Sequence, residues 1–225
     1  MVFRHEIKHL INEADYLAIS KRLKFIAHVD KNAREGKDYK IRSLYFDNYS
    51  DKALNEKLLG INNREKFRLR YYNDDTSFIR LEKKSKYNGL CSKVSTFISK
   101  EKCNLLIEGE IDFLKESTEP LFNELYVKMK TQLIKPKTIV DYVRQAYIYE
   151  PGNVRITFDK SIKTGLFAVD FLNTEKLTVE TLDKRYIILE VKYDAFLPQI
   201  IADCIQTNER RATAFSKYAV CRMYG

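Results

Sequence analysis

Arg and Lys side chains fall on one face of six strand-like segments of the chain. The segments are 65–73, 77–87, 90–98, 138–149, 153–160 and 186–194. Because successive side chains of a β-strand point to opposite faces, each segment would have one charged face and one apolar face. The guanidinium of Arg and the ammonium of Lys match phosphate oxygens in charge and geometry. The pattern therefore indicates binding of a phosphate-rich anion.

These charged faces carry mainly cations with isolated carboxylates. Their members are Lys66, Arg68, Arg70, Arg80, Glu82, Lys84, Lys86, Lys93, Arg144, Arg155, Asp159, Glu190 and Lys192. A half-exposed antiparallel sheet also has a charged face, but such a face usually mixes signs and includes neutral polar residues. Since like charges on adjacent strands repel, six cationic faces favour a bound polyanion. A closed barrel could place these faces in its lumen and form a basic tunnel.

Three glutamates, Glu6, Glu82 and Glu190, are candidate ligands for a divalent metal ion. Mg²⁺ and Mn²⁺ take oxygen ligands and bridge phosphates, so a few carboxylates beside a phosphate chain could hold either ion. For each glutamate taken alone, a salt bridge to a neighbouring Lys is the simpler interpretation.

Hydrophobic periodicity and turn residues predict the elements that must position these side chains. Strands are predicted at 3–11, 39–46, 65–73, 77–87, 90–98, 138–149, 153–160 and 186–194, with weaker strands at 165–172 and 175–181. Helices are predicted at 13–28 after an Asn12 cap, and at 50–59, 99–108, 119–132, 198–208 and 213 to the end. Most strands are adjacent and hairpin-linked, with Asn88-Gly89 as the strongest turn signal. The sheet should therefore be antiparallel and the domain α+β.

Composition limits the class of partner and compartment. The 225 residues suit one domain over 1–225, and 40 Lys+Arg against 31 Asp+Glu give a net charge of +9, which favours anionic partners. The aromatic residues fall mostly on apolar faces, so no nucleic-acid partner is expected. The four cysteines lack Cys-x-x-Cys spacing, which favours a reducing cytoplasm. No signal peptide and no transmembrane segment is expected from the charged start and the short apolar runs.

Eight short segments carry a resemblance to a known family. They are F-R-H-E-I-K (3–8), S-L-Y-F-D-N (43–48), K-F-R-L-R-Y-Y (66–72), L-E-K-K-S-K-Y-N-G (81–89), Y-V-R-Q-A-Y (142–147), V-R-I-T-F-D (154–159), I-L-E-V-K-Y (188–193) and F-S-K-Y (215–218). In number and order they resemble the vacuolar transporter chaperone (VTC) polyphosphate polymerase domain, a branch of the triphosphate tunnel metalloenzymes. The resemblance covers nearly the whole chain.

The resemblance implies an antiparallel barrel of about eight strands that forms a basic tunnel, with helices packed around it. It implies a metal-dependent enzyme that transfers the terminal phosphate of a nucleoside triphosphate such as ATP to a growing polyphosphate chain. The tunnel cations that it implies are Lys8, Arg68, Arg70, Lys84, Lys93, Arg144, Arg155 and Lys217, and strand periodicity adds Lys86 and Lys192 to the phosphate-binding set. Glu190 would be the metal ligand, with Glu6 and Glu82 as further candidates. Lys84, Arg144 and Lys217 are expected to act in catalysis.

Two positions depart from the pattern of the family. Arg4 stands where the wider superfamily often has the first Glu of Glu-x-Glu-x-Lys, and Ala214 stands where the eukaryotic polymerases have a second lysine. Three functions stay open: a polymerase, a hydrolase of tripolyphosphate or nucleoside triphosphate, and a non-catalytic module that binds polyphosphate. RNA binding is a weaker variant of the third. The expected partners are a nucleoside triphosphate and polyphosphate, and a membrane-protein partner stays unknown.

Overall fold

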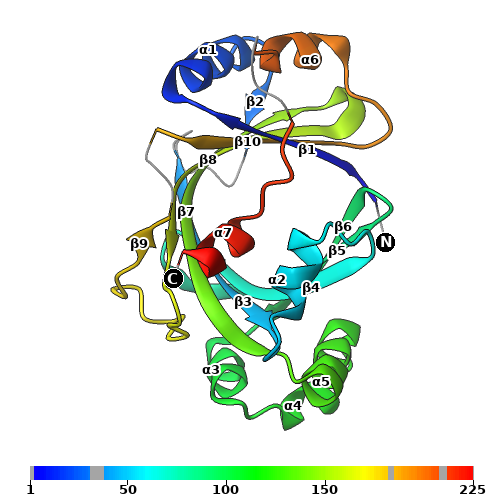
Figure 1. Ribbon diagram of the computed structural model, residues 1–225, viewed down its shortest axis with the longest axis vertical. Coiled ribbons are helices and arrows are strands. Elements are labelled where there is room, and N and C mark those ends of the chain that lie inside the picture. Colours follow the sequence, from blue (N-terminus) through cyan, green and yellow to red (C-terminus); the bar gives the residue numbers. More distant parts are fainter. Residues whose placement is uncertain (1–2, 31–37, 182–184, 208–211, 225) are drawn as a thin grey trace.

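One antiparallel sheet organises the molecule. The computed structural model describes residues 3–30, 38–181, 185–207 and 212–224. Eight strands follow the order β1-β10-β8-β7-β3-β4-β5-β6 (Figure 1). Their bounds are β1 (His5–Ile11), β3 (Tyr39–Asp47), β4 (Arg64–Tyr72), β5 (Asp75–Tyr87), β6 (Leu90–Ile98), β7 (Lys135–Tyr149), β8 (Val154–Thr164) and β10 (Ile187–Tyr193). The two-residue strands β2 (His28–Val29) and β9 (Val179–Glu180) pair with β7 and β8.

The two edges of this sheet meet next to the first residue of β1. The backbone N–H of Arg4 donates to the carbonyl of Cys91 in β6 at 2.9 Å, and the Cys91 N–H donates back to Arg4 at 2.9 Å. The curled sheet is therefore closed by one bridge. This arrangement confirms the predicted α+β class and the antiparallel barrel of about eight strands.

Local sequence signals set the ends of several elements. Asn12 caps α1 (Glu13–Leu23) by accepting the Asp15 N–H at 2.9 Å, while the Asp15 carboxylate accepts the Asn12 N–H at 3.2 Å. This reciprocal pair is a capping box. The β5–β6 turn places Asn88 at φ 45° and Gly89 at φ 86°, the left-handed pair that a type I′ hairpin turn requires. This turn fixes which side chains of β5 and β6 share a face.

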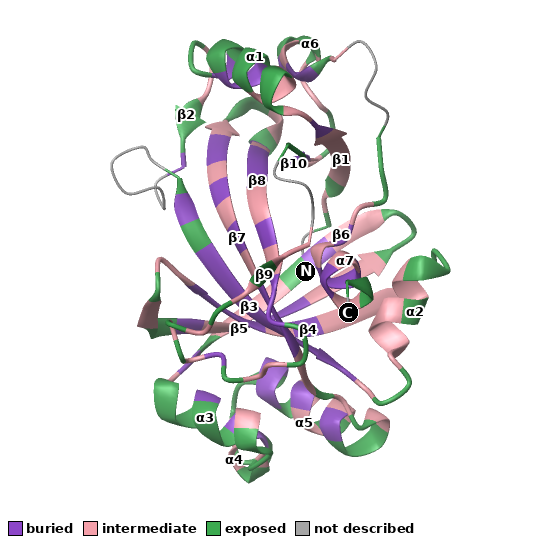
Figure 2. Cartoon of the chain, turned by 60° about the vertical axis from the view of Figure 1, so that its left-hand side comes forward, coloured by how far each residue is buried: buried purple, intermediate pink, exposed green. Residues whose placement is uncertain are grey.

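Helices cover the apolar outer face of the sheet at two places. The bounds of the helices are α1 (Glu13–Leu23), α2 (Lys52–Leu58), α3 (Lys100–Glu108), α4 (Asp112–Lys115), α5 (Pro120–Gln132), α6 (Gln199–Ile205) and α7 (Lys217–Met223), with a 3₁₀ turn at Pro151–Asn153. The group α3–α5 packs on Leu69 and Leu81, whereas α1 and α6 pack on Ile156 and Val191. Buried residues follow the strands, and the helices expose their outer sides (Figure 2). The apolar faces of the strands are thus used as core.

The last helix, α7, lies inside the curve of the sheet (Figure 1). Tyr218 and Cys221 of α7 pack against Tyr45 and Tyr142, and the Tyr218 hydroxyl donates to the Asp47 carboxylate at 2.6 Å. The packing and hydrogen bond of Tyr218 hold the start of α7 against the inner face of the barrel. The positioning of Lys217 depends on this packing.

The prediction of a strand at 165–172 is wrong. Leu166 has a φ of 55°, and the segment is a loop. Phe171 is fully buried in this loop, and its carbonyl accepts the Tyr71 hydroxyl at 3.1 Å. Ala168, Val169 and Leu172 also pack on this core, whereas Phe167 is exposed. Packing of a loop on the core therefore explains most of the apolar residues of the segment. The helices at the two chain ends are also shorter than predicted, since α1 ends at Leu23 and α7 begins at Lys217.

None of the helices in the described part of the chain is long and apolar enough to cross a membrane.

Candidate functional site

A cavity of about 420 Å³ lies within the barrel and is lined by charged side chains. Every residue of the predicted phosphate-binding set borders it: Lys8, Arg68, Arg70, Lys84, Lys86, Lys93, Arg144, Arg155, Lys192 and Lys217. The metal candidates Glu6 and Glu190 border it as well, whereas Glu82 does not. The fold therefore brings side chains from β1, β4, β5, β6, β7, β8 and β10 together around one cavity. Ala214 also lines the cavity, so that position contributes no charge.

Three lysines stand directly opposite one another across three strands. Lys66 of β4 is in register with Lys84 of β5, and Lys84 is in register with Lys93 of β6. Like charges at such cross-strand positions destabilise a sheet. A ladder of this kind needs anionic partners, which carboxylates or a bound anion can supply.

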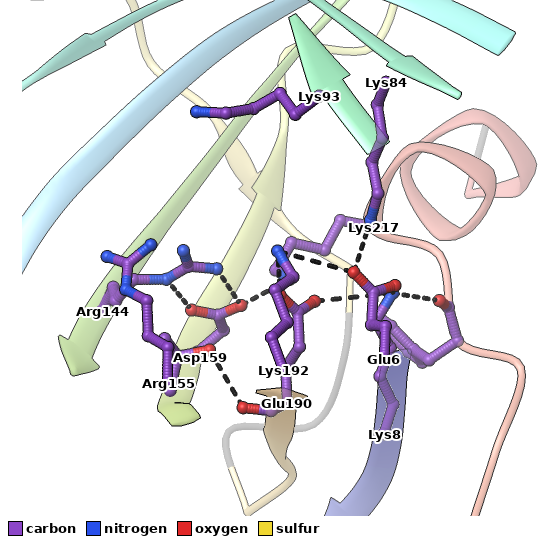
Figure 3. Close-up of polar contacts among 12 residues, drawn as sticks. Glu6, Lys8, Lys84, Lys93, Arg144, Arg155, Asp159, Glu190, Lys192 and Lys217 are labelled. Atoms are coloured by element: carbon purple, nitrogen blue, oxygen red, sulfur yellow. Dashed lines mark hydrogen bonds and ion pairs between the residues drawn. The ribbon is translucent and has the colours of Figure 1, made fainter. Parts of the chain in front are cut away.

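A network of alternating charges joins β1 to β10 (Figure 3). The Lys8 ammonium lies 2.9 Å from Glu6 and 3.5 Å from Glu190, and the Lys192 ammonium lies 3.5 Å from Glu6 and 2.9 Å from Glu190. Lys84 reaches across the lumen and donates to Glu6 at 2.7 Å. The two carboxylates thus share the same cations, and both face the cavity.

The network keeps its carboxylates ionised. Burial and the neighbouring Glu190 would each raise the pKa of Glu6, but Lys84, Lys8 and Lys192 outweigh them and hold that pKa well below its ordinary range. Burial would likewise raise the pKa of Glu190, and the nearby lysines hold it well below its ordinary range. Both groups are therefore anionic oxygen donors at neutral pH.

Arg144, Asp159 and Lys217 form a second buried cluster. The Arg144 guanidinium donates two hydrogen bonds to the Asp159 carboxylate at 2.6 and 2.8 Å, and Lys217 forms an ion pair with the same carboxylate. Burial would raise the pKa of Asp159, but Arg144 and Lys217 lower it to about 2. Alternation places Asp159 on the charged face of 153–160 but predicts no role for it. It positions two of the three predicted catalytic cations.

Glu82 has a different environment from Glu6 and Glu190. Its side chain is fully buried, and it accepts hydrogen bonds from Arg68 at 2.8 Å and from Lys93 at 2.9 Å. Arg70 lies 3.7 Å away. Since three cations surround a carboxylate that does not border the cavity, the contacts suit the positioning of Arg68 and Lys93. A metal-ligand role for Glu82 stays a prediction.

Lys66 is a cavity residue that alternation places on the charged face of 65–73 but that is not in the predicted phosphate-binding set. Its ammonium lies 5.2 Å from the centre of the Tyr45 ring and 5.7 Å from that of Tyr218, and it donates to Ser216 at 3.5 Å. Among the residues that the structure describes, no carboxylate forms an ion pair with it. Burial lowers the pKa of Lys66 to about 7, with Lys84 adding to the effect. Lys66 lies between Glu65 and Phe67, which point to the other face of an alternating strand. This alternation was the signal in the sequence for a place of Lys66 in the cavity.

Tyr45 shares this environment. Burial would raise the pKa of its phenol, but Arg68, Lys66 and Arg70 outweigh burial and lower that pKa to about 7. The Tyr45 hydroxyl also accepts a hydrogen bond from Arg68 at 2.8 Å. Tyr45 lies in the predicted strand 39–46, and no part in the site was predicted for it.

The donors present fit a divalent metal ion only together with a phosphate. Within the described ranges, no group of three or more His, Cys, Asp or Glu side chains could hold a metal ion. Glu6 and Glu190 offer two carboxylates toward the cavity. Mg²⁺ commonly binds through one or two carboxylates plus substrate phosphates and waters, so this donor set is sufficient when phosphate oxygens complete it.

A family model described as the VTC domain matches residues 3–224. The sequence has no significant match among the curated proteins. Among solved structures, a candidate adenylate cyclase from Vibrio parahaemolyticus is similar at 12% identity and a TM-score of 0.46, over 90% of this chain and 82% of that chain. A candidate adenylate cyclase from Bacillus halodurans is similar at 14% identity and a TM-score of 0.44, over 85% and 80%. The PH1012 protein from Pyrococcus horikoshii is similar at 14% identity and a TM-score of 0.42, over 90% and 85%. Similarities this low assign no activity to the chain.

Proposed function

The chain belongs to the VTC domain family, and on that premise we propose that it is a metal-dependent polyphosphate polymerase. It transfers the terminal phosphate of a nucleoside triphosphate, such as ATP, to the end of a polyphosphate chain. Its partners are then these two phosphate compounds, and its cofactor is Mn²⁺ or Mg²⁺.

The ladder of Lys66, Lys84 and Lys93 carries this proposal. Lys84 contacts Glu6 and Lys93 contacts Glu82, so these carboxylates offset part of the repulsion within the ladder. Phosphate oxygens between the three side chains would relieve the rest. The opposite wall contributes Arg144 and Lys217, so a linear phosphate chain has cations on both sides. A compact anion would use only part of this lining.

The chain's own residues bind and orient the reacting phosphates. Arg68 and Arg70 face the cavity with guanidinium groups, which bind phosphate oxygens in a forked geometry. Arg144 and Lys217, held by Asp159, neutralise charge on the transferring phosphate. Phosphoryl transfer needs positioning and charge stabilisation more than covalent help from the protein. The terminal phosphate of polyphosphate is already anionic at neutral pH, so no general base is required.

Glu6 and Glu190 are the residues that would hold the metal ion. The chemistry supplied there would be neutralisation of part of the charge on the phosphates. Lys8 and Lys192 lie between these two carboxylates and keep their side chains in place.

The decisive experiment supplies purified protein with ATP, a short polyphosphate primer and Mn²⁺ or Mg²⁺. Long chains together with ADP on a gel support the polymerase. Free phosphate without long chains would instead identify a hydrolase that uses water as the acceptor. Binding of primer and ATP without turnover would identify a non-catalytic module.

Glu190→Gln tests the metal site, with Glu108→Gln as the matched control. Glu108 is exposed at the end of α3, outside the cavity. Glu190→Gln should leave roughly 1% of the activity or less, because removing a metal ligand costs more than the 10- to 100-fold typical of an outer-shell partner. Mn²⁺ binding in the presence of tripolyphosphate should weaken in parallel. Full activity and unchanged Mn²⁺ binding in Glu190→Gln would refute the assigned metal role.

A further inference from the structure

The lining of the barrel changes character from one end to the other. By strand alternation, the side chains on the inner face of β4 run in the order Arg64, Lys66, Arg68, Arg70, Tyr72, and those on β5 run in the order Lys86, Lys84, Glu82, Arg80, Phe78. On β6 the order is Cys91, Lys93, Ser95, Phe97. One end of these three strands is therefore cationic, and the other end is aromatic.

The aromatic end is formed by Phe78, Arg80 and Phe97, which we call the aromatic mouth. The two phenyl rings lie 5.8 Å apart at an angle of 34°, and each residue is about half exposed, at 46% and 50%. The Arg80 guanidinium lies 5.0 Å from the centre of the Phe78 ring and donates to Ser95 at 3.3 Å. No carboxylate among the described residues forms an ion pair with Arg80. Two half-exposed rings leave apolar surface open to water beside a guanidinium that has no carboxylate partner in this part of the described chain.

The aromatic mouth lies outside the residues that line the cavity, but it lies on the same strand face, one register position away from them. Arg80 is in register with Arg70, which borders the cavity, and with Phe97. Strands rise about 3.3 Å per residue, so the backbone of Phe78 lies about 13 Å from that of Glu82, which positions Arg68. This separation leaves room for a sugar between a triphosphate at Arg68 and Arg70 and a ring at Phe78.

We propose that the aromatic mouth binds the nucleobase of the donor nucleoside triphosphate. The base stacks on the rings of Phe78 and Phe97, and Arg80 faces the phosphate nearest the sugar. A nucleotide supplies a flat π surface and a negative charge next to each other, which matches the adjacent rings and guanidinium. This inference rests on the proposed function, since it assigns the donor end of the same tunnel.

This placement gives the tunnel a direction. The terminal phosphate of the nucleotide then points toward Lys84 and Lys66, and the growing chain extends toward the end that carries Arg64 and Lys86. Stacking tolerates any base because every base has a π surface. ATP, GTP and UTP should therefore all be donors.

Phe78→Ala and Phe97→Ala test the inference, with Phe25→Ala as the matched control. Phe25 is 89% exposed next to the end of α1 and does not line the cavity. Calorimetric titration would measure binding of ATP and of tripolyphosphate, which lacks a base, to each variant. Removal of a stacking ring should weaken ATP binding roughly tenfold, while tripolyphosphate binding should change less than about twofold. Phe78→Tyr keeps the ring and should keep the affinity for ATP.

The two ligands separate failure of this inference from failure of the proposed function. If wild-type protein binds tripolyphosphate but the phenylalanine variants lose ATP and tripolyphosphate affinity equally, or lose neither, the aromatic mouth does not bind the base. If the wild type binds neither ligand, the proposed function fails, and the donor site fails with it.

Discussion

Replacing Glu82 by Gln tests whether this carboxylate organises the cations of the tunnel. Gln has almost the same shape as Glu, so the change removes charge without creating a cavity. Arg68 and Lys93 would lose the buried partner that they contact at 2.8 and 2.9 Å. Removing one partner of a buried ion pair typically costs about 3–5 kcal/mol, and the half-exposed Lys93 places the expected loss toward the lower end of that range.

The expected loss is large enough to measure as a melting temperature. For a protein of 150–250 residues, about 1 kcal/mol corresponds to roughly 2–4 °C, so Glu82→Gln should melt about 6–20 °C below wild type. Saturating tripolyphosphate should recover part of this loss, because phosphate oxygens replace the missing carboxylate beside Arg68. Differential scanning calorimetry with and without tripolyphosphate measures both effects. Glu108→Gln, an exposed surface change, should stay within about 0.5 kcal/mol of wild type.

A melting temperature of Glu82→Gln close to that of the control would refute the organising role. If, in addition, Mn²⁺ binding in the presence of tripolyphosphate were lost, Glu82 would be a metal ligand. Retained Mn²⁺ binding with a lowered melting temperature would support the role that its contacts indicate.

Other predictions address the phosphate-binding cations and the acid response. Lys84→Ala should weaken tripolyphosphate binding and raise the KM for ATP, whereas Lys115→Ala, which removes an exposed lysine on α4, should leave both unchanged. Because the pKa of Lys66 is about 7, tripolyphosphate affinity should fall as pH rises above that value. The fall should be less steep in Lys66→Arg, which stays charged. Parallel curves of affinity against pH for the two proteins would contradict a role of Lys66 in binding. The pKa of Asp159 is lowered to about 2 and that of Glu190 is lowered too, so their stabilisation is present above the unfolded pKa and lost as pH falls toward the folded one. Melting temperatures should accordingly drop between about pH 4 and pH 2, and less so in Asp159→Asn.

Strand periodicity was sufficient to predict the inner face of the barrel. Alternation on β4 and β5 placed Arg68 and Lys84 on one side, and the hairpin turn at Asn88-Gly89 fixed the register between β5 and β6. The alternation worked because the opposite positions, such as Leu69 and Leu81, pack beneath α3–α5. Each face of these strands thus has a single environment.

Strand alternation could not distinguish the roles of individual side chains on that inner face. Glu82 and Glu190 are equivalent in pattern, but Glu82 is enclosed by cations and Glu190 borders the cavity. Asp159 acquires its role through Lys217, which lies 58 positions later in the chain and reaches it only because α7 packs inside the sheet. Such long-range contacts depend on tertiary packing and leave no local periodicity.

Apolar residues buried in a loop caused the incorrect prediction of a strand at 165–172. Phe171 is as buried as any strand residue. A local apolar run therefore does not distinguish a loop that packs on the core from a strand. Closure of the barrel was also beyond local signals, since it rests on the pairing of Arg4 with Cys91.

In the alternating array of Glu6, Lys8, Glu190 and Lys192, the fixed carboxylates neutralise lysines that would otherwise attract dissolved anions. When a polyanion enters, phosphates exchange with these fixed carboxylates as partners of the lysines, so few dissolved ions are released. In nucleic acids each neutralised phosphate contributes about 0.7–0.9 to the slope of log affinity against log salt. The slope for polyphosphate should therefore be set by cations such as Lys66, which pair with no carboxylate in the described part of the chain. Binding would then remain tight at salt concentrations that remove polyphosphate from an ordinary basic surface.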